Sequence, residues 1–479
     1  MKRSYKLYTL LLAGITLLGT GCKKFLNVNT DPNDPLSVNE SLILNPVEIT
    51  TGTQVTGGFY GTTCAYWMQY LSLNQPSPNA ESYLILPLDV DNTWTFYEYP
   101  NTFENLKVMI GQAEAAGHNQ YAAIGKILFA YNLAITTDLW GDIPYSQAFD
   151  IVKNPKPGYD SQESIYGDIQ NLLDSGIYYA AQTPSAVAPG TEDFIYGGKM
   201  TAWTKFAYAL KARYYIHLTK APGRTASVQA DSALAALANA FASNDDNAQV
   251  NYPGSAQAEN PWWSNTQPGA GGVVMAASFI DSLQARNDPR LPIIADTGKN
   301  GTYLGRTMGA DPSPDPTVFS SFRPIYGGYL PLEDDNSGTS APLYLMTYSE
   351  ALFIKAEATF IKSGAAAAQP IYDAAIAAHM SMLGVGAGAS AAYIASRPLL
   401  TTGNAIQQII TEKYVANFLN PESWNDWRRT GFPALSLVQN AYVNYIPRHW
   451  PIAQTETLTN PQPQQNGITT ASRVWWDAP

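Results

Sequence analysis

Histidine is the first side chain to examine for metal or acid–base chemistry, and this sequence spaces its histidines too widely for either. The chain has four, and no two lie closer than 70 residues. It therefore contains neither an HExxH pair nor a Cys/His zinc pattern, since both need ligands a few residues apart. No GxSxG elbow marks a nucleophilic serine. The glycines of "GVGAGA" (384–389) lack a strand–turn–helix context and are interpreted as a flexible turn.

Paired carboxylates are the remaining catalytic chemistry, because a glycosidase places two of them around one bond. Glu350 and Glu357 lie seven residues apart, on one face of a predicted helix. Structural roles are favoured for both. Glu350 completes a capping box with Thr347, Glu357 can pair with a nearby base, and Asp426 stands beside two arginines at a helix end.

Two segments cluster oxygen ligands that suit calcium, "LDVDNTW" (88–94) and "SNDDNAQ" (243–249). Neither has the EF-hand spacing with its glycine and final glutamate. Solvated loops are the favoured interpretation, so we expect no cofactor and leave calcium as an open alternative.

Aromatic loops are the strongest indication of a binding site. The segments "DNTWTFYEY" (91–99) and "NPWWSN" (260–265) place rings beside amide and carboxylate side chains, and a helix is not expected at the second. A flat ring covers the apolar face of a sugar, while amides bond its hydroxyls. Packing of these rings onto the helices is the alternative. The candidate ligand-binding residues are Asn92, Trp94, Tyr97, Trp262, Trp263 and Asn265.

Helices must position these loops, and the periodicity of apolar residues predicts where the helices lie. Apolar residues recur every three or four positions in 121–139, 203–218 and 406–418. Irregular stretches rich in Gly, Pro and Asn separate the helices, and loops of such length are usually functional. The main ones are 51–104, 181–198, 244–275 and 296–342.

The N-terminus predicts export and lipid attachment. Residues 1–21 combine a basic start with an apolar stretch of 12 residues, which is typical of a signal peptide and too short to span a bilayer. Cys22 follows "LGTG", a pattern similar to a lipobox, so we predict that it carries the lipid. Residues 22–40 are interpreted as a flexible tether and 41–479 as the binding domain. Cys64 is then a buried small hydrophobic residue.

Composition argues against two classes of partner. The net charge is −11, and only 14% of residues are charged. Such a chain has no electrostatic reason to bind nucleic acid or an anionic lipid surface.

Six motifs in order resemble the SusD/RagB family of outer-membrane lipoproteins of Bacteroidota, most closely its SusD-like subgroup. They are "FLNVNTDPNDP" (25–35), "TDLWGDIPYSQAF" (137–149), "WTKFAYALKARYYIHL" (203–218), "LMTYSEALFIKAEA" (345–358), "IITEKYVANFLNPESWNDWRRTGFP" (409–433) and "IPRHWPIAQTETLTN" (446–460). Together they cover nearly the whole mature chain.

The resemblance implies an all-α domain of tetratricopeptide-like helix pairs whose long loops form the ligand face. It implies a non-enzymatic, surface-exposed lipoprotein that captures glycan and acts as lid for a SusC-like TonB-dependent transporter. The shared motifs look structural, so no ligand residue carries over from them. Lys23 and Lys24 depart from the acidic residues that often follow the lipid cysteine in surface-exposed relatives.

Three alternatives remain open at this stage. The chain could bind a peptide or another small nutrient with the same architecture. It could be a lipoprotein glycosidase, or a transporter subunit with no ligand site of its own.

Overall fold

The computed structural model describes residues 38–255, 258–264, 272–322 and 338–479. The signal peptide, Cys22, most of the predicted tether and Asn265 lie outside these ranges. The first helix begins at Glu40, and the side chain of Asn39 caps it by accepting the amide of Ser41.

Helices dominate the described chain, as predicted. The α-helices are α2 (Glu40–Thr50), α3 (Phe59–Trp67), α4 (Asn105–Ala116), α5 (Asn119–Trp140), α6 (Gln162–Ala180), α7 (Met200–His217), α8 (Ala226–Leu237), α9 (Pro261–Ser264), α10 (Ala277–Ala285), α11 (Leu291–Ile294), α12 (Tyr348–Ser363), α13 (Ala365–Met382), α14 (Ala387–Ala395), α15 (Ala405–Ala416), α16 (Glu422–Thr430) and α17 (Gln454–Thr459). Short 3₁₀ turns occupy Ala80–Ser82, Leu218–Lys220, Asn244–Asp246, Pro316–Val318 and Pro463–Gln465.

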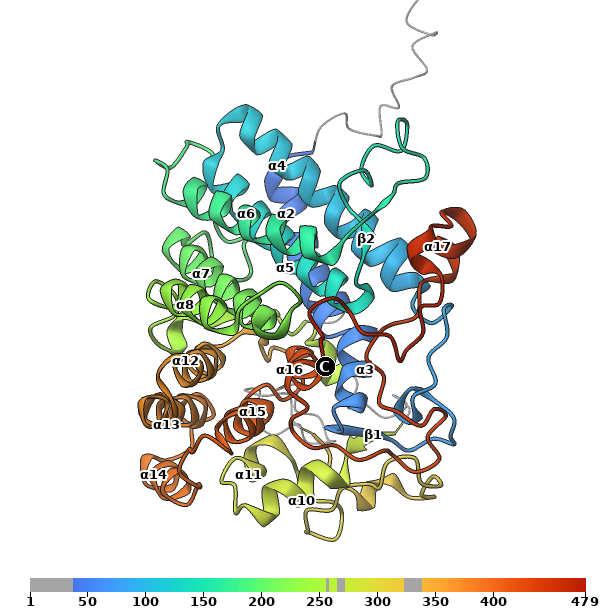
Figure 1. The fold of residues 1–479 in the computed structure, drawn as a ribbon, viewed down its shortest axis with the longest axis vertical. Helices are drawn as coiled ribbons and strands as arrows, with labels where there is room; N and C mark the ends of the chain where they lie inside the picture. Colours follow the sequence, from blue (N-terminus) through green and yellow to red (C-terminus); the bar gives the residue numbers. More distant parts are fainter. Residues whose placement is uncertain (1–37, 256–257, 265–271, 323–337) are drawn as a thin grey trace, which may run out of the picture.

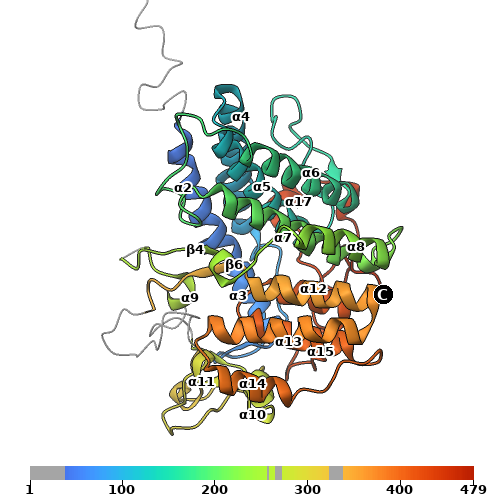
Figure 2. The ribbon, with the colours of Figure 1, turned by 90° about the vertical axis from the view of Figure 1, so that its left-hand side faces the viewer.

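Consecutive helices stack into a layered scaffold. From α4 through α5, α6, α7, α8, α12 and α13, each helix lies against the next, as the view in Figure 2 shows. The three helices predicted from periodicity are present as α5, α7 and α15, and their apolar residues are buried. The all-α, tetratricopeptide-like fold is therefore confirmed.

Two apolar cores hold the stack. The larger one runs through α3, α5, α6 and α7, while α12, α13 and α15 enclose a second around Phe353, Tyr372 and Ile409. Cys64 is a free thiol within the larger core, as predicted. No helix in the described ranges is long and apolar enough to cross a membrane.

Strands are few and serve to tie loops together. Three two-stranded antiparallel sheets pair β1 (Leu71–Leu73) with β5 (Val273–Met275), β2 (Ile143–Pro144) with β3 (Tyr159–Asp160), and β4 (Ala248–Val250) with β6 (Leu343–Met346). Each pair joins segments that a helix or a long loop separates in sequence.

The interpretation of 51–104 as one irregular stretch is wrong. It contains α3 and two π-helices, Thr51–Thr56 and Thr93–Glu104. The prediction failed because glycines, β-branched residues and Pro100 hide the helical pattern of these segments. Their side chains nevertheless pack against α2 and α5, so tertiary burial outweighs weak propensity. Likewise "NPWWSN" contains the short helix α9, where none was expected.

Loop segments gather opposite the helix stack. In Figure 1 the stack lies on the left, while α17 and the C-terminal loops, in red, lie on the right. The chain that follows α16, residues 431–479, passes along this side, and its C-terminus lies beside α16 (Figure 1). Irregular chain therefore forms much of this side of the molecule.

Candidate functional site

The first predicted segment, 91–99, serves mainly to hold α17. Trp94 is 3% exposed and its Nε1 donates to the Oε2 of Glu456 at 3.2 Å. Its ring meets Trp140 edge to face, with centroids 5.0 Å apart. A buried ring cannot stack on a sugar, so the predicted platform fails at Trp94. Asn92 is exposed and Tyr97 is half-buried, and their ligand roles stay predictions.

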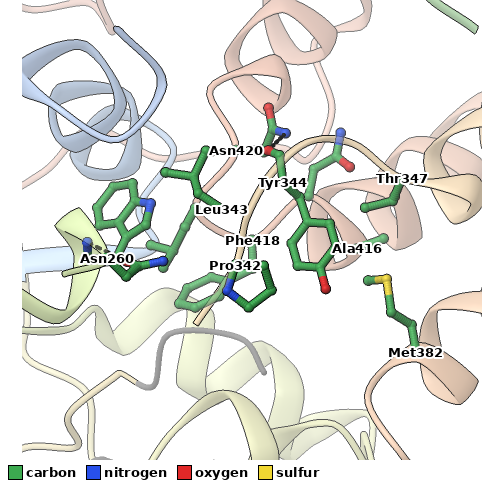
Figure 3. Close-up of a pocket in the computed structure, with 12 residues that line it drawn as sticks. Asn260, Pro342, Leu343, Tyr344, Thr347, Met382, Ala416, Phe418 and Asn420 are labelled. Carbon is green, nitrogen blue, oxygen red and sulfur yellow. Dashed lines mark hydrogen bonds between the residues drawn. The ribbon is translucent and has the colours of Figure 1, made fainter. Parts of the chain in front are cut away.

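The second predicted segment lines a small pocket, shown in Figure 3. Trp262 is 4% exposed, and its ring lies 6.3 Å from that of Phe322. Asn260 fixes this turn: its Oδ1 accepts the amide of Trp262 at 2.8 Å, and its Nδ2 donates to the carbonyl of Ala341 at 2.8 Å. The prediction of an open stacking surface fails at Trp262 as well, because the ring packs into the protein.

The pocket itself joins four parts of the chain. Asn260 approaches from the start of α9, Tyr344 from β6, Met382 from the end of α13, and Asn420 from the segment before α16 (Figure 3). Its cavity measures about 40 Å³. That space holds water but no sugar ring, since ligand pockets usually measure about 300–1,000 Å³. Trp263 is half-buried beside it, and Asn265 lies outside the described residues.

A larger hollow lies along the C-terminal segment. It measures about 540 Å³ and falls within the usual range for ligand pockets. A neighbouring hollow of about 140 Å³ shares Ile452 and Ile468 with it. We call the two together the C-terminal groove. The larger hollow is lined by Pro87, Pro451, Ile452, Thr457, Pro461, Gln462, Pro463, Gln465, Asn466, Ile468 and Thr469. The smaller is lined by Trp140, Gly141, Asp142, Tyr159, His449, Ile452, Gln464, Ile468, Arg473, Val474 and Trp475.

Glu456 of α17 supports the wall of the C-terminal groove through hydrogen bonds with three other residues. Its carboxylate accepts from Trp94, from the hydroxyl of Tyr159 at 3.0 Å and from the Nδ2 of Asn460 at 2.8 Å. Burial raises the pKa of Glu456, and these hydrogen bonds partly offset that rise. These hydrogen bonds fix the position of α17 and so support the residues after it, which line the groove.

Side-chain amides form the part of this wall that lies nearer to solvent. Gln462 donates to the carbonyl of Pro157 at 3.2 Å and to the Oδ1 of Asn460 at 2.8 Å, while Gln465 donates to Tyr159 at 2.9 Å. Asn466 is exposed at the rim. Because Pro461 and Pro463 restrict the backbone, little conformational entropy is lost when a ligand binds.

The smaller hollow adds aromatic and charged groups. Arg473 donates to Asp477 at 2.8 Å, and Asp142 accepts the amide of Gln162 at 2.9 Å. Burial lowers the pKa of His449 to about 4, so this imidazole is neutral at pH 7. Trp475 is half-buried. Among these lining residues, no nucleophile is hydrogen-bonded to a base.

The chain was next compared with known proteins. The family model described as "SusD-like_2: Starch-binding associating with outer membrane" matches residues 32–448. The chain belongs to this family. No curated protein matched in a sequence comparison.

Solved structures share the SusD-like fold. A SusD/RagB family protein from Bacteroides thetaiotaomicron aligns with a TM-score of 0.74 and 22% identity over 92% of this chain and 99% of its own. A chitin-binding SusD homologue from Flavobacterium johnsoniae aligns with a TM-score of 0.74 and 23% identity, over 92% of this chain and 97% of its own. A further structure, titled a chitin-binding protein, gives a TM-score of 0.76 at 22% identity, over 92% of this chain and 100% of its own.

The motifs that this SusD-like chain shares with its family carry buried charges. Arg213 of α7 forms a bidentate pair with Glu350 of α12, at 2.8 and 2.7 Å. Lys413 of α15 lies 2.8 Å from Asp426 of α16 and 3.9 Å from Glu350. The pairing joins four helices of the scaffold across its interior.

A second pairing extends this network. Arg429 contacts both carboxylate oxygens of Glu357 and lies 3.0 Å from Asp426. We call the connected group the ionic layer, and its members are Arg213, Glu350, Glu357, Lys413, Asp426 and Arg429. All six are buried. Glu350 and Glu357 are therefore ion-paired inside the protein, and no substrate reaches them as they stand.

The predicted start of α12 is present in the structure. Thr347 caps this helix by accepting the amide of Glu350 at 3.1 Å, although the Glu350 carboxylate pairs with Arg213 instead of completing the capping box. The helix begins at Tyr348, directly after the predicted cap.

The acidic segments predicted as possible calcium sites use their carboxylates within the protein. Asp91 accepts from the amide and hydroxyl of Thr455 at 3.0 and 2.9 Å, and Asp246 pairs with Lys205 at 2.7 Å. In the described ranges, no group of three or more His, Cys, Asp or Glu residues is arranged to hold a metal ion. Calcium binding stays untested.

Sequence reasoning missed the C-terminal groove. The segment "IPRHWPIAQTETLTN" carried the family resemblance, and its continuation received no role. The signal was the run "NPQPQQN" (460–466), in which amides alternate with prolines directly after a short helix. Such a run keeps hydrogen-bonding groups at the surface on a stiff backbone.

Proposed function

We propose that this protein is a lipid-anchored, outward-facing binder of a neutral glycan in the C-terminal groove. It would pass that glycan uncleaved to a SusC-like TonB-dependent transporter. The observation that carries the proposal is the groove: a hollow of about 540 Å³ whose polar lining is mostly amides and hydroxyls. Membership of a family described as starch-binding and associated with the outer membrane supports it.

The chemistry of the larger hollow matches a sugar. Pyrrolidine rings of Pro87, Pro451 and Pro461 offer apolar contact for the C–H faces of a pyranose. The exposed side chain of Asn466 offers an amide donor and an acceptor for its hydroxyls. A neutral ligand needs no counter-charge, and the lining of this hollow contains no Lys, Arg, Asp or Glu.

The membrane anchor follows from the N-terminal sequence. Lipid on Cys22 would hold the protein at the outer membrane, and the tether would let the domain move over its transporter. Lys23 and Lys24 make the outward face the part of this proposal that most needs a test. Cys22→Ser is expected to move the protein from the membrane to the soluble fraction. Unchanged fractionation would contradict lipid attachment, and protease treatment of intact cells distinguishes the two faces.

The transporter partner comes from the family resemblance. Co-purification of a TonB-dependent transporter with the tagged protein would support it. A binder that never co-purifies with such a transporter would contradict the lid role and leave glycan binding intact.

Affinity gel electrophoresis tests the proposed ligand class. We expect a gel containing one of a panel of neutral polysaccharides to retard the protein, with no release of reducing ends. Hydrolysis abolished by Glu350→Gln or Glu357→Gln would overturn the proposal in favour of a glycosidase. Binding to peptides alone, or to nothing in the panel while the transporter co-purifies, would equally overturn it.

A further inference from the structure

The loop between β2 and β3 presents two adjacent apolar side chains to solvent. Ile151 is 77% exposed and Val152 is 90% exposed. Single exposed apolar residues are ordinary on soluble proteins. Two neighbouring β-branched residues at the tip of one loop have no such explanation, because the same chain buries most of its Ile and Val.

The protein holds this loop out rather than letting it fold back. The carboxylate of Asp160 accepts the amides of Tyr145 and Ser146 at 3.1 and 2.8 Å, which closes the base of the loop. Phe149 packs against Phe103 of the preceding π-helix, with ring centroids 6.1 Å apart. The tip beyond Phe149 is therefore carried on a fixed stem.

The loop lies at the end of the molecule where the tether enters. Figures 1 and 2 both show the β2–β3 loop and the start of α2 at the same end, with α14 at the other. Leu42, in the first turn of α2, is also exposed, at 67%. Exposed apolar side chains are therefore present both on this loop and on the first turn of α2, the helix that follows the predicted tether.

Basic residues flank the apolar tip. Lys153 and Lys156 are exposed on the loop, and Lys107 of α4 donates to the carbonyl of Phe149 at 3.4 Å. Of the nearby acids, Asp150 pairs with Lys153 at 2.8 Å, and Asp160 is used by the stem. Residues 150–156 contain two lysines and one aspartate, a net charge of +1, although the whole chain carries −11.

We propose that Ile151 and Val152 insert into the headgroup region of the membrane that carries the lipid anchor. Lys153 and Lys156 then meet lipid phosphates. The inference rests on the proposed anchor, because two side chains bury too little area to bind a membrane alone. The anchor raises the effective concentration of lipid at the loop, so a weak contact becomes occupied.

The contact would orient the binding site. Pro157, at the far side of the loop, accepts hydrogen bonds from Asn460 at 3.0 Å and from Gln462 at 3.2 Å. Gln462 lines the C-terminal groove. A loop fixed on the membrane therefore fixes the direction in which the groove opens.

Environment-sensitive fluorescence in vesicles tests this contact. The acylated full-length V152C protein is labelled with a nitrobenzoxadiazole dye, since the anchor blocks Cys22 and Cys64 is buried. It is then reconstituted into vesicles of phosphatidylcholine and phosphatidylglycerol. The matched control is L399C, at an apolar residue 74% exposed in the connection that follows α14.

We expect the dye at position 152 to shift to the blue in vesicles and to lose emission when the lipid carries a doxyl quencher. The dye at position 399 should do neither. K153Q/K156Q should weaken the quenching at position 152 in these anionic vesicles. A dye at position 152 that behaves like the one at 399 would overturn the proposal, as would quenching that appears only with the transporter present. Failure of the anchor itself is distinguishable, because the protein would then not float with the vesicles.

Discussion

The ionic layer and the C-terminal groove use polar groups in opposite ways. The ionic layer buries full charges between four helices and pairs each of them, as Arg213 pairs with Glu350 at 2.7 Å. The larger hollow of the groove is instead lined by neutral amides, hydroxyls and prolines at the surface. The difference indicates that buried charges in this protein join its helices, while the proposed recognition of glycan uses neutral hydrogen bonds.

The largest expected effect comes from breaking the ionic layer. Arg213→Met leaves the Glu350 carboxylate buried without its bidentate partner, so the free energy of unfolding should fall by about 3–5 kcal/mol. Urea denaturation measures the loss. The control is Lys362→Met, which removes a partly exposed pair with Asp231 and should cost less than about 1 kcal/mol. Equal losses in the two variants would contradict the structural role of the layer.

The second effect tests a buried carboxylate that lacks a partner. Glu98, in the π-helix Thr93–Glu104, is fully buried, and within the described structure neither carboxylate oxygen has a hydrogen-bond partner. The hydroxyl of Thr136 lies near it but donates to the carbonyl of Asn132 at 2.9 Å. Burial accordingly raises the pKa of Glu98 from 4.5 to about 8.

The sign of the pH dependence follows from that pKa. Between about pH 5 and pH 8 the folded protein keeps a proton that the unfolded chain releases, so stability falls as the pH rises through this window. Glu98→Gln should remove that slope and stabilise the protein at pH 8 by on the order of 3 kcal/mol. Urea denaturation at pH 5 and pH 8 measures both. Glu104→Gln, at an exposed glutamate of the same π-helix, should leave the slope unchanged. A slope that persists in Glu98→Gln would show that another group carries it.

The third effect addresses the groove. Gln464→Ala/Asn466→Ala removes two exposed amides that line it. The affinity for the glycan should fall about tenfold or more, because each lost hydrogen bond contributes about 1 kcal/mol. Stability should stay within about 0.5 kcal/mol of the wild type, as for other surface changes. Isothermal titration gives the affinity, and Gln407→Ala, at an exposed amide of α15, is the control. Undiminished affinity in the double variant would contradict glycan binding in the C-terminal groove.

The smallest expected effect is that of salt on the affinity for the glycan. A ligand held by neutral groups should bind with the same affinity, within about twofold, from 50 to 500 mM NaCl, because screening acts only on charges. A steep decrease with salt would point to a charged ligand, and to Arg473 and Asp142 as its contacts.

The scaffold could be predicted from the sequence because its helices have regular apolar faces. The periodicity of 121–139 alone places α5, although the structure buries this helix on nearly every side, and the Thr347 signal marks the start of α12 within one residue. A basic partner for Glu357 was also predicted, but as a nearby base of an amphipathic helix, whereas the structure supplies Arg429 from α16, 72 residues further along the chain. What failed was 51–104, where the helices are held by tertiary contacts.

The kinds of residue in a binding site could be predicted from the sequence, but the position of the proposed site could not. In the sequence, Trp94 and Trp262 cannot be distinguished from exposed stacking rings, because composition does not say whether a ring faces solvent or the core. Burial depends on chain that is distant in sequence, such as Glu456 for Trp94 and Phe322 for Trp262. The groove was missed for the same reason, since Pro87 reaches it from more than 360 residues away.

Hydrogen–deuterium exchange with and without the retained glycan tests the central claim most directly. If the C-terminal groove holds the ligand, amides in 451–469 should exchange more slowly in the complex, while the helices of the ionic layer remain unchanged. Protection confined to Asn92–Tyr97 or Asn260–Ser264, with 451–469 unaffected, would contradict the account.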